Sequence, residues 1–210
     1  MITVVKRITT ELGKHAPFTA GGAVSGIVVM AIIVFTNVPS SISETIFYTL
    51  HPVHVVLSAL VTTAMYKRYG EGKLWTAILI GYTGSIGIAT LSDSIIPHLG
   101  GMLLNITMEF HVGFIEKWWL VNPLAFLGIA IGYLRPTTKF PHAGHMLLST
   151  WASLFYFTAF GAAEWIPLLP LIFVFLFLAV WIPCCVSDIV YPLLFLKGVE
   201  AESSETKPHP

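Results

Sequence analysis

Two histidine pairs, each with a spacing of three residues, are the part of this sequence best suited to chemistry. The first pair opens the segment His51–Ser58 (HPVHVVLS), and the second opens the segment His142–Ser149 (HAGHMLLS). Residues three apart lie on the same face of a helix, so each pair can direct two imidazoles at one ligand. Imidazole nitrogen is a preferred ligand of zinc and iron. The shared letters indicate an internal duplication.

A second shared motif, Ser-Asp-x-x-x-Pro, follows each histidine pair. Its aspartates keep a similar distance from the histidines: Asp93 follows His51 by 42 positions, and Asp188 follows His142 by 46. An ionisable group within a membrane span is costly unless it has a partner, and a metal ion shared with two neutral imidazoles would supply one. The two copies therefore predict two related His/Asp clusters that bind a divalent metal ion, zinc or iron.

The first cluster has further candidate ligands nearby in the sequence. A third imidazole, that of His98, lies five residues after Asp93. Three imidazoles and one carboxylate suit zinc, or iron with added water. The ligands predicted for this first site are His51, His54, Asp93 and His98, and His111 is predicted to complete the shell.

A zinc ion at the first site would also permit catalysis, because zinc lowers the pKa of a bound water toward about 7. Glu109 lies just downstream of the cluster and is the predicted general base. Ser58 or Ser92 is the predicted positioning group. An enzyme needs one complete site, and a second copy can lose its ligands. The number of ligands in the second cluster therefore discriminates between catalysis and transport.

The second cluster is poorer in ligands than the first. Leu193 stands where the first copy has His98. Cys184 lies one helical turn before Asp188 and is the predicted replacement, as a softer thiolate ligand. The ligands predicted for the second site are His142, His145, Asp188 and Cys184.

Purely structural roles for these motifs stay open. Ser92 and Ser187 can hydrogen-bond back to their own helices, and the following prolines can end those helices. An aspartate paired with a protonated histidine would also be stable without a metal. Gly128 and Gly132 are four residues apart, a spacing that favours close helix packing over ligand binding.

The composition defines the environment in which these side chains must be positioned. Hydrophobic residues make up 55% of the 210 residues, charged residues make up 10%, and the mean hydropathy is +0.79. A soluble domain carries about 25% charged residues. The chain is therefore predicted to be an all-α integral membrane protein whose main partner is the lipid bilayer. Its formal net charge of zero leaves no basic surface for nucleic acid.

Segments of about 20 apolar residues are long enough to cross the hydrocarbon core. Residues 101–118 are mildly apolar but carry several charges, and we expect an interfacial or re-entrant helix there. Residues 1–17 are predicted to lie at the membrane interface, and residues 198–210 to form a disordered polar tail. The six predicted transmembrane helices are 18–38, 46–66, 74–96, 119–134, 142–162 and 166–190.

The positions of Lys and Arg predict the orientation. If the N-terminus is cytoplasmic and six segments cross, every Lys and Arg except Lys117 falls on the inner side, as the positive-inside rule expects. Both termini are then cytoplasmic. Each copy holds three spans, so residues 18–100 and 101–197 form two inverted repeats, an arrangement common in secondary transporters. The two clusters would then lie about 15–20 Å apart, at about 1.5 Å per residue.

Three functions fit these observations. The leading hypothesis is a divalent-metal-ion transporter or channel. The first alternative is an integral-membrane zinc or iron metalloenzyme that hydrolyses a lipid-like substrate. The second is a haem-binding electron-transfer protein in which His54 faces His98 or His111. A homo-oligomer is compatible with all three, and the sequence has no P-loop, H-E-x-x-H or G-x-S-x-G motif.

Overall fold

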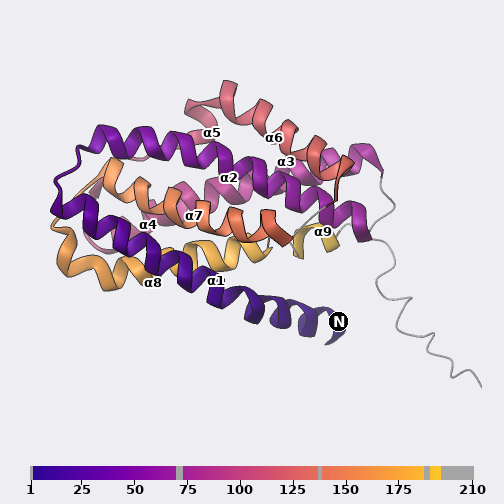
Figure 1. The fold of residues 1–210 in the computed structure, drawn as a ribbon, viewed down its shortest axis with the longest axis horizontal. Helices are drawn as coiled ribbons and strands as arrows, with labels where there is room; N and C mark the ends of the chain where they lie inside the picture. The colour runs from indigo at the N-terminus through magenta and orange to yellow at the C-terminus, as the bar shows by residue number, and fades with distance from the viewer. Residues whose placement is uncertain (1, 70–72, 137–138, 187–189, 195–210) are drawn as a thin grey trace, which may run out of the picture.

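The computed structural model describes residues 2–69, 73–136, 139–186 and 190–194, and it is all-α apart from one two-residue strand pair. The long helices lie side by side (Figure 1). They are α1 (Ile2–Phe35), α2 (Ser40–Tyr69), α3 (Leu74–Thr90), α6 (Trp118–Leu134), α7 (Lys139–Phe160) and α8 (Trp165–Cys185). The short elements are the π-helix η1 (Leu91–Ile95), α4 (Ile96–Leu103), α5 (Gly113–Glu116), α9 (Tyr191–Leu194) and the strands β1 (Thr107–Met108) and β2 (Gly161–Ala162).

Within the described residues, four stretches of helix are long and apolar enough to cross a membrane. They are Ala16–Phe35, Ser40–Arg68, Leu74–Leu103 and Trp165–Cys185. The third runs without interruption through α3, η1 and α4. Helix α6 is apolar but has only 17 residues, fewer than the about 20 that cross the hydrocarbon core. The prediction of an all-α chain is confirmed, and these helices are long and apolar enough to span a membrane.

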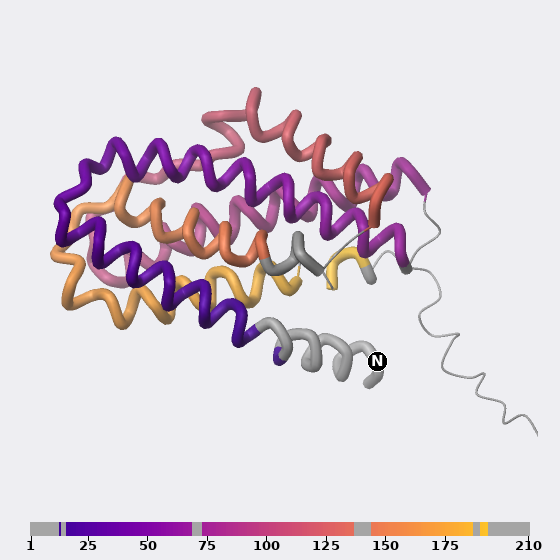
Figure 2. Tube along the Cα trace, viewed as in Figure 1, coloured from indigo at the N-terminus to yellow at the C-terminus, as the bar shows by residue number. Residues whose placement is uncertain are grey.

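Helix α2 occupies the middle of the bundle. It packs against α7, α6 and α3, while α1 and α8 cover the other side of α7 (Figure 2). Helix α2 begins at Ser40, six residues earlier than predicted, so His51 and His54 lie well inside the helix. The core between α2, α7 and α8 is aromatic and aliphatic, with Phe47, Tyr156 and Leu176 fully buried. The histidines of α2 therefore project into a closely packed interior.

Residues 101–118 do not form the single helix that was predicted. Helix α4 ends at Leu103, and Asn105 takes a left-handed backbone conformation with φ of 55°. Strand β1 then pairs antiparallel with β2, with Thr107 opposite Ala162. One further helical turn, α5, precedes α6. The chain folds back at this point because the turn at Asn105 directs the backbone onto the residues that follow α7.

Close packing of α6 on α2 depends on two glycines, as the sequence predicted. A Cβ at Gly128 would collide with the carbonyl oxygen of Val56, and one at Gly132 would collide with that of Leu60. We expect Gly128→Val to lower the thermal unfolding temperature in detergent, since overpacking costs about 1–3 kcal/mol. The matched control is Gly87→Val, where a Cβ meets no atom within 4 Å. Equal unfolding temperatures in the two variants would contradict this packing.

Candidate metal centre

Asp93 connects the two histidines of the first copy. It is fully buried and lies in the π-helical turn η1. Its Oδ2 is 2.9 Å from His51 Nδ1 and 2.7 Å from His54 Nδ1. A carboxylate can only accept hydrogen bonds, so each Nδ1 carries the proton. In its neutral form each imidazole then keeps its lone pair on Nε2, the atom available to a metal.

The other oxygen of Asp93 is held by serines. Oδ1 accepts hydrogen bonds from Ser92 Oγ at 2.7 Å and from Ser149 Oγ at 2.9 Å. Ser153 Oγ donates to the carbonyl oxygen of Ser92 at 2.9 Å. Ser149 and Ser153 come from α7, so donors from α2, η1 and α7 fix this carboxylate. Both of its oxygens are therefore fixed, and the imidazoles that donate to it are held in one orientation.

Three side chains from three helices form a group that could hold a metal ion. They are His54 on α2, His145 on α7 and Cys184 on α8, and their ligand atoms all lie within 4.8 Å of one another. The side chains are buried, and the two imidazole rings stack at 5.7 Å with an interplanar angle of 15°. Ligands of a tetrahedral zinc lie about 2.0 Å (nitrogen) and 2.3 Å (sulfur) from the ion. Small side-chain movements would bring this set to that geometry.

The surroundings of His54 match those of a metal-bound histidine. Such a histidine usually donates its other ring N–H to a carboxylate, which fixes the tautomer and the ring orientation. Asp93 accepts this hydrogen bond from His54 Nδ1. Among the residues that the structure describes, His54 Nε2 has no hydrogen-bond partner, although it is buried. A buried polar atom in this state costs free energy, and a bound ion would remove that cost.

The other predicted residues of α2 lie near this group but outside it. His51 shares Asp93 with His54, stacks on Phe47 at 5.6 Å, and lies against the backbone of Gly113. Ser58 is buried one turn after His54, and its Oγ has no hydrogen-bond partner in the described part of the chain. Ser149, its counterpart at the same offset in the second copy, donates to Asp93, and the positioning role of Ser58 stays a prediction.

The structure does not bring His98, His111 or Glu109 to Asp93, and the predicted first site is corrected in this respect. The ring of His98 packs on Phe110 at 4.8 Å, and His98 does not belong to the group of ligands around His54. The turn at Asn105 carries the other two away. His111 stacks on Phe160 at 4.1 Å, and the side chain of Glu109 is 84% exposed.

The prediction of two separate clusters, one toward each membrane face, is wrong for the residues described. His145 and Cys184 belong to the second copy, yet they lie with His54 of the first. Ser149 of the second copy likewise donates to Asp93 of the first. The two copies therefore build one common centre. The side chain of His142 and the whole of Asp188 lie outside the described residues, and their roles as ligands stay predictions.

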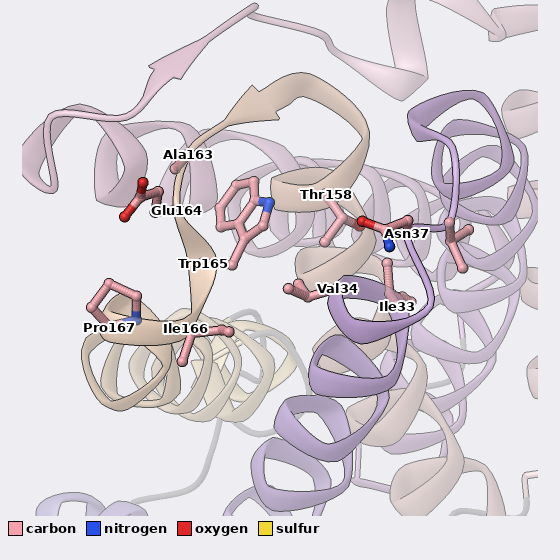
Figure 3. Close-up of a pocket in the computed structure, with 10 residues that line it drawn as sticks. Ile33, Val34, Asn37, Thr158, Ala163, Glu164, Trp165, Ile166 and Pro167 are labelled. Atoms are coloured by element: carbon pink, nitrogen blue, oxygen red, sulfur yellow. The ribbon is translucent and has the colours of Figure 1, made fainter.

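A separate surface cleft of about 420 Å³ lies between the turn after α1 and the start of α8 (Figure 3). Its lining includes Asn37, Glu164 and Trp165 and none of the predicted metal ligands. The cleft offers no convergent imidazole or thiol. The buried group of His54, His145 and Cys184 is therefore the better candidate for metal binding.

The fold has helices long and apolar enough to cross a membrane and a buried His54–His145–Cys184 group, supported by Asp93, that could bind a metal ion. Ser149 and Ser153 are the site residues that sequence reasoning missed, although the repeat of Ser58 at Ser149 was a usable signal. No protein-family model matches the chain, and no curated protein and no solved structure is significantly similar to it.

Proposed function

We propose that this protein is a membrane-embedded carrier for a divalent transition-metal ion, with Zn²⁺ bound by His54, His145 and Cys184. The observation that carries the proposal is the convergence of two imidazoles and one thiol, from three helices, within 4.8 Å. Two nitrogen ligands and one sulfur ligand are a set that zinc binds well. Asp93 supports the set by orienting His54 through Nδ1.

The position of the centre favours transport. His54 lies fourteen residues from either end of the membrane-spanning stretch Ser40–Arg68, which is its middle. The ligands come from both copies of the repeated motif. Secondary transporters with inverted repeats place their ion sites near the bilayer midplane, between the repeats. An ion bound here is equally far from both surfaces, as a carrier with alternating access requires.

The charge of the buried groups favours a divalent ion. Asp93 is the only carboxylate among the buried residues that the structure describes, and no Lys or Arg of that part is buried. A bound thiolate from Cys184 adds a second negative charge. A divalent ion would make the centre neutral, whereas a monovalent or trivalent ion would leave an unpaired charge. Such a charge near the bilayer centre costs several kcal/mol.

The proposal includes the six-span arrangement with both termini cytoplasmic. Helices α6 and α7 would be the fourth and fifth spans, since both pack directly on the membrane-spanning helix α2. All three ligands belong to one chain, so transport would require no second copy.

A metalloenzyme that acts on a lipid-like substrate is the second candidate. It is favoured by an apolar cleft of about 280 Å³ between η1 and α8, lined by residues that include Leu91, Ile96 and Pro183. These residues neighbour Asp93 and Cys184 in sequence, so an acyl chain in the cleft would lie near the centre. Three protein ligands would also leave a fourth position for water. The predicted general base Glu109 is exposed, however, which weakens this candidate.

The haem alternative has the least support. It needs His54 to face His98 or His111 across the porphyrin. The rings of His98 and His111 instead pack on Phe110 and Phe160. The short distance between the stacked rings of His54 and His145 also favours one small ion over a porphyrin.

Uptake of radioactive zinc into proteoliposomes tests the proposal. Removal of an outer-shell partner lowers metal affinity by about 10–100-fold. We expect His145→Ala to lower the affinity by more than this, because it removes a direct ligand. Its initial uptake rate at limiting zinc should fall accordingly. The matched control is His98→Ala, which removes an imidazole outside the centre and should leave uptake unchanged.

Three outcomes would contradict this proposal. Wild-type protein that moves no more zinc than empty liposomes is not a zinc carrier, and zinc that is bound but not moved would favour the enzyme. Equal uptake by His145→Ala and wild type would show that the ion does not pass through the buried group.

A further inference from the structure

The backbone of α5 covers the buried imidazole of His51. Gly113 is the first residue of α5 and lies directly on the imidazole of His51. A Cβ at this position would be 2.6 Å from His51 Cδ2 and 3.0 Å from Nε2. His51 is fully buried, and beyond it lie Asp93 and then His54. The short turn at Gly113 therefore covers a continuous path of polar side chains that leads to the metal centre.

Backbone pairing and close packing anchor the first half of the segment that carries Gly113. Strand β1 pairs with β2, and the N–H of Glu109 donates to the carbonyl oxygen of Phe160 at 3.0 Å. A Cβ at Gly101 would also collide with the side chain of Met108, so β1 lies tightly against α4. These backbone contacts fix the chain up to Glu109.

The polar contacts of residues 110–117 converge on one carboxylate, while Phe110, His111 and Phe114 make apolar ring contacts with the bundle. Glu116 accepts a hydrogen bond from the Tyr48 hydroxyl of α2, and its Oε1 accepts the N–H of Val112 at 3.0 Å. Both of its oxygens lie 3.1 Å from His111 Nδ1. The Tyr156 hydroxyl of α7 accepts the N–H of His111 at 3.0 Å. Glu116 thus joins α5 to His111 and to α2.

We propose that residues 110–117 form a gate over the route by which the ion reaches the centre, closed by the Glu116–His111–Tyr48 contacts. The proposal rests on the proposed metal binding at His54, His145 and Cys184. Opening requires that α5 leave α2 and α3 and that Phe114 leave the cluster around Val55, while β1 stays paired with β2. The gate then uncovers His51, the first imidazole on the way to Asp93 and His54.

The gate should respond to pH through His111. Burial alone would lower the pKa of His111, but its hydrogen bonds to Glu116 and Glu109 outweigh burial and raise it. Burial would raise the pKa of Glu116, but hydrogen bonds from Tyr48, His111 and the N–H of Val112 lower it. The other groups around this pair are the Tyr156 hydroxyl and Lys117, whose ammonium lies over the Tyr48 ring at 4.9 Å.

These shifts set the direction of the response. A group whose pKa is raised in the closed state stabilises the closed state at pH values below that pKa. This stabilisation is lost as the pH rises through the pKa. Glu116 stays ionised down to its lowered pKa. The gate is therefore most firmly closed at pH values between the lowered pKa of Glu116 and the raised pKa of His111. It loosens above the pKa of His111.

The test is the rate at which metal-free, full-length protein takes up cobalt, followed by absorption after mixing. We expect Glu116→Gln to load about tenfold faster than wild type at pH 6, the effect of losing one charge-assisted hydrogen bond. The ratio of the two rates should be smaller at high pH, where wild type has lost the imidazolium but Glu116 still accepts from Tyr48 and Val112. Final cobalt content should be equal, because no ligand is changed. The matched control is Glu164→Gln, a glutamate of the surface cleft (Figure 3).

A rate ratio of one at every pH would overturn the gate. Wild-type protein that takes up no cobalt would instead overturn the proposed function. The gate stays testable in that event by hydrogen exchange at the amides of Val112 and Gly113 in metal-free protein. Exchange should be about tenfold faster in Glu116→Gln than in wild type at pH 6. Equal exchange would show that Glu116 does not hold the segment closed.

Discussion

Replacing Asp93 with alanine should both weaken metal binding and destabilise the fold. Loss of the carboxylate that orients a histidine ligand lowers metal affinity by about 10–100-fold. The same change leaves His51, His54 and Ser149 without their buried partner. Each buried donor left without its acceptor costs about 1–3 kcal/mol. We therefore expect weak zinc binding in a chelator competition and a marked fall in unfolding temperature.

Asp93→Asn separates the two effects. Asparagine keeps the volume and can still accept from the serines at the position of Oδ1. Its amide would place N–H groups toward His51 and His54, which forces their Nδ1 atoms to accept and puts the ring proton on Nε2. We expect this variant to fold well and still bind zinc poorly. Zinc affinity equal to wild type in both Asp93 variants would contradict the role given to this carboxylate.

The two neighbouring cysteines provide the second large contrast. Both are buried, but only Cys184 belongs to the group that could hold a metal. We expect Cys184→Ser to lose the thiolate-to-metal charge-transfer absorption of the cobalt-loaded protein and to bind zinc far more weakly. A serine hydroxyl stays protonated and lacks the soft sulfur that favours zinc. Cys185→Ser makes the same replacement of sulfur by oxygen outside the group. It should keep both the charge-transfer absorption and the zinc affinity.

Elemental analysis of the purified variants completes this comparison. One zinc per chain in wild type and Cys185→Ser, with little in Cys184→Ser, is the expected pattern. The same zinc content in both cysteine variants would place the ion elsewhere.

Several residues of the buried group could be predicted from the sequence, because the motifs that contain them occur twice. The doubled His-x-x-His and Ser-Asp motifs pointed to His51, His54 and Asp93, which the structure brings together, and to His145 and Cys184. The apolar composition predicted membrane-spanning helices, since few charges remain to cover a soluble surface. These inferences use residue types and short spacings, which a sequence states directly.

The joining of the two clusters could not be predicted from spacing alone. The sequence argument assigned each cluster to the end of a span, but α2 starts at Ser40 and holds His54 in its middle. The π-helical turn at Asp93 is also invisible to a periodicity argument, because it adds a residue within an otherwise regular helix. The first residue of a helix determines how deep in the bundle each of its side chains lies. Helix boundaries are the weakest part of a prediction from sequence.

The positions of Glu109 and His111 depended on tertiary pairing. Nothing in the local sequence states that β1 pairs with β2, which lies more than fifty residues later. That pairing and the turn at Asn105 move both side chains to the end of the bundle. There they join Glu116 and Tyr48 and not Asp93.

The most direct test of the central claim is X-ray absorption at the zinc edge of the detergent-purified, zinc-loaded protein. The account predicts a first shell with two imidazole nitrogens at about 2.0–2.1 Å and one sulfur at about 2.3 Å. That result would identify His54, His145 and Cys184 as the ligands when the sulfur disappears in Cys184→Ser. A shell with only nitrogen and oxygen, or a protein that retains no zinc, would contradict it.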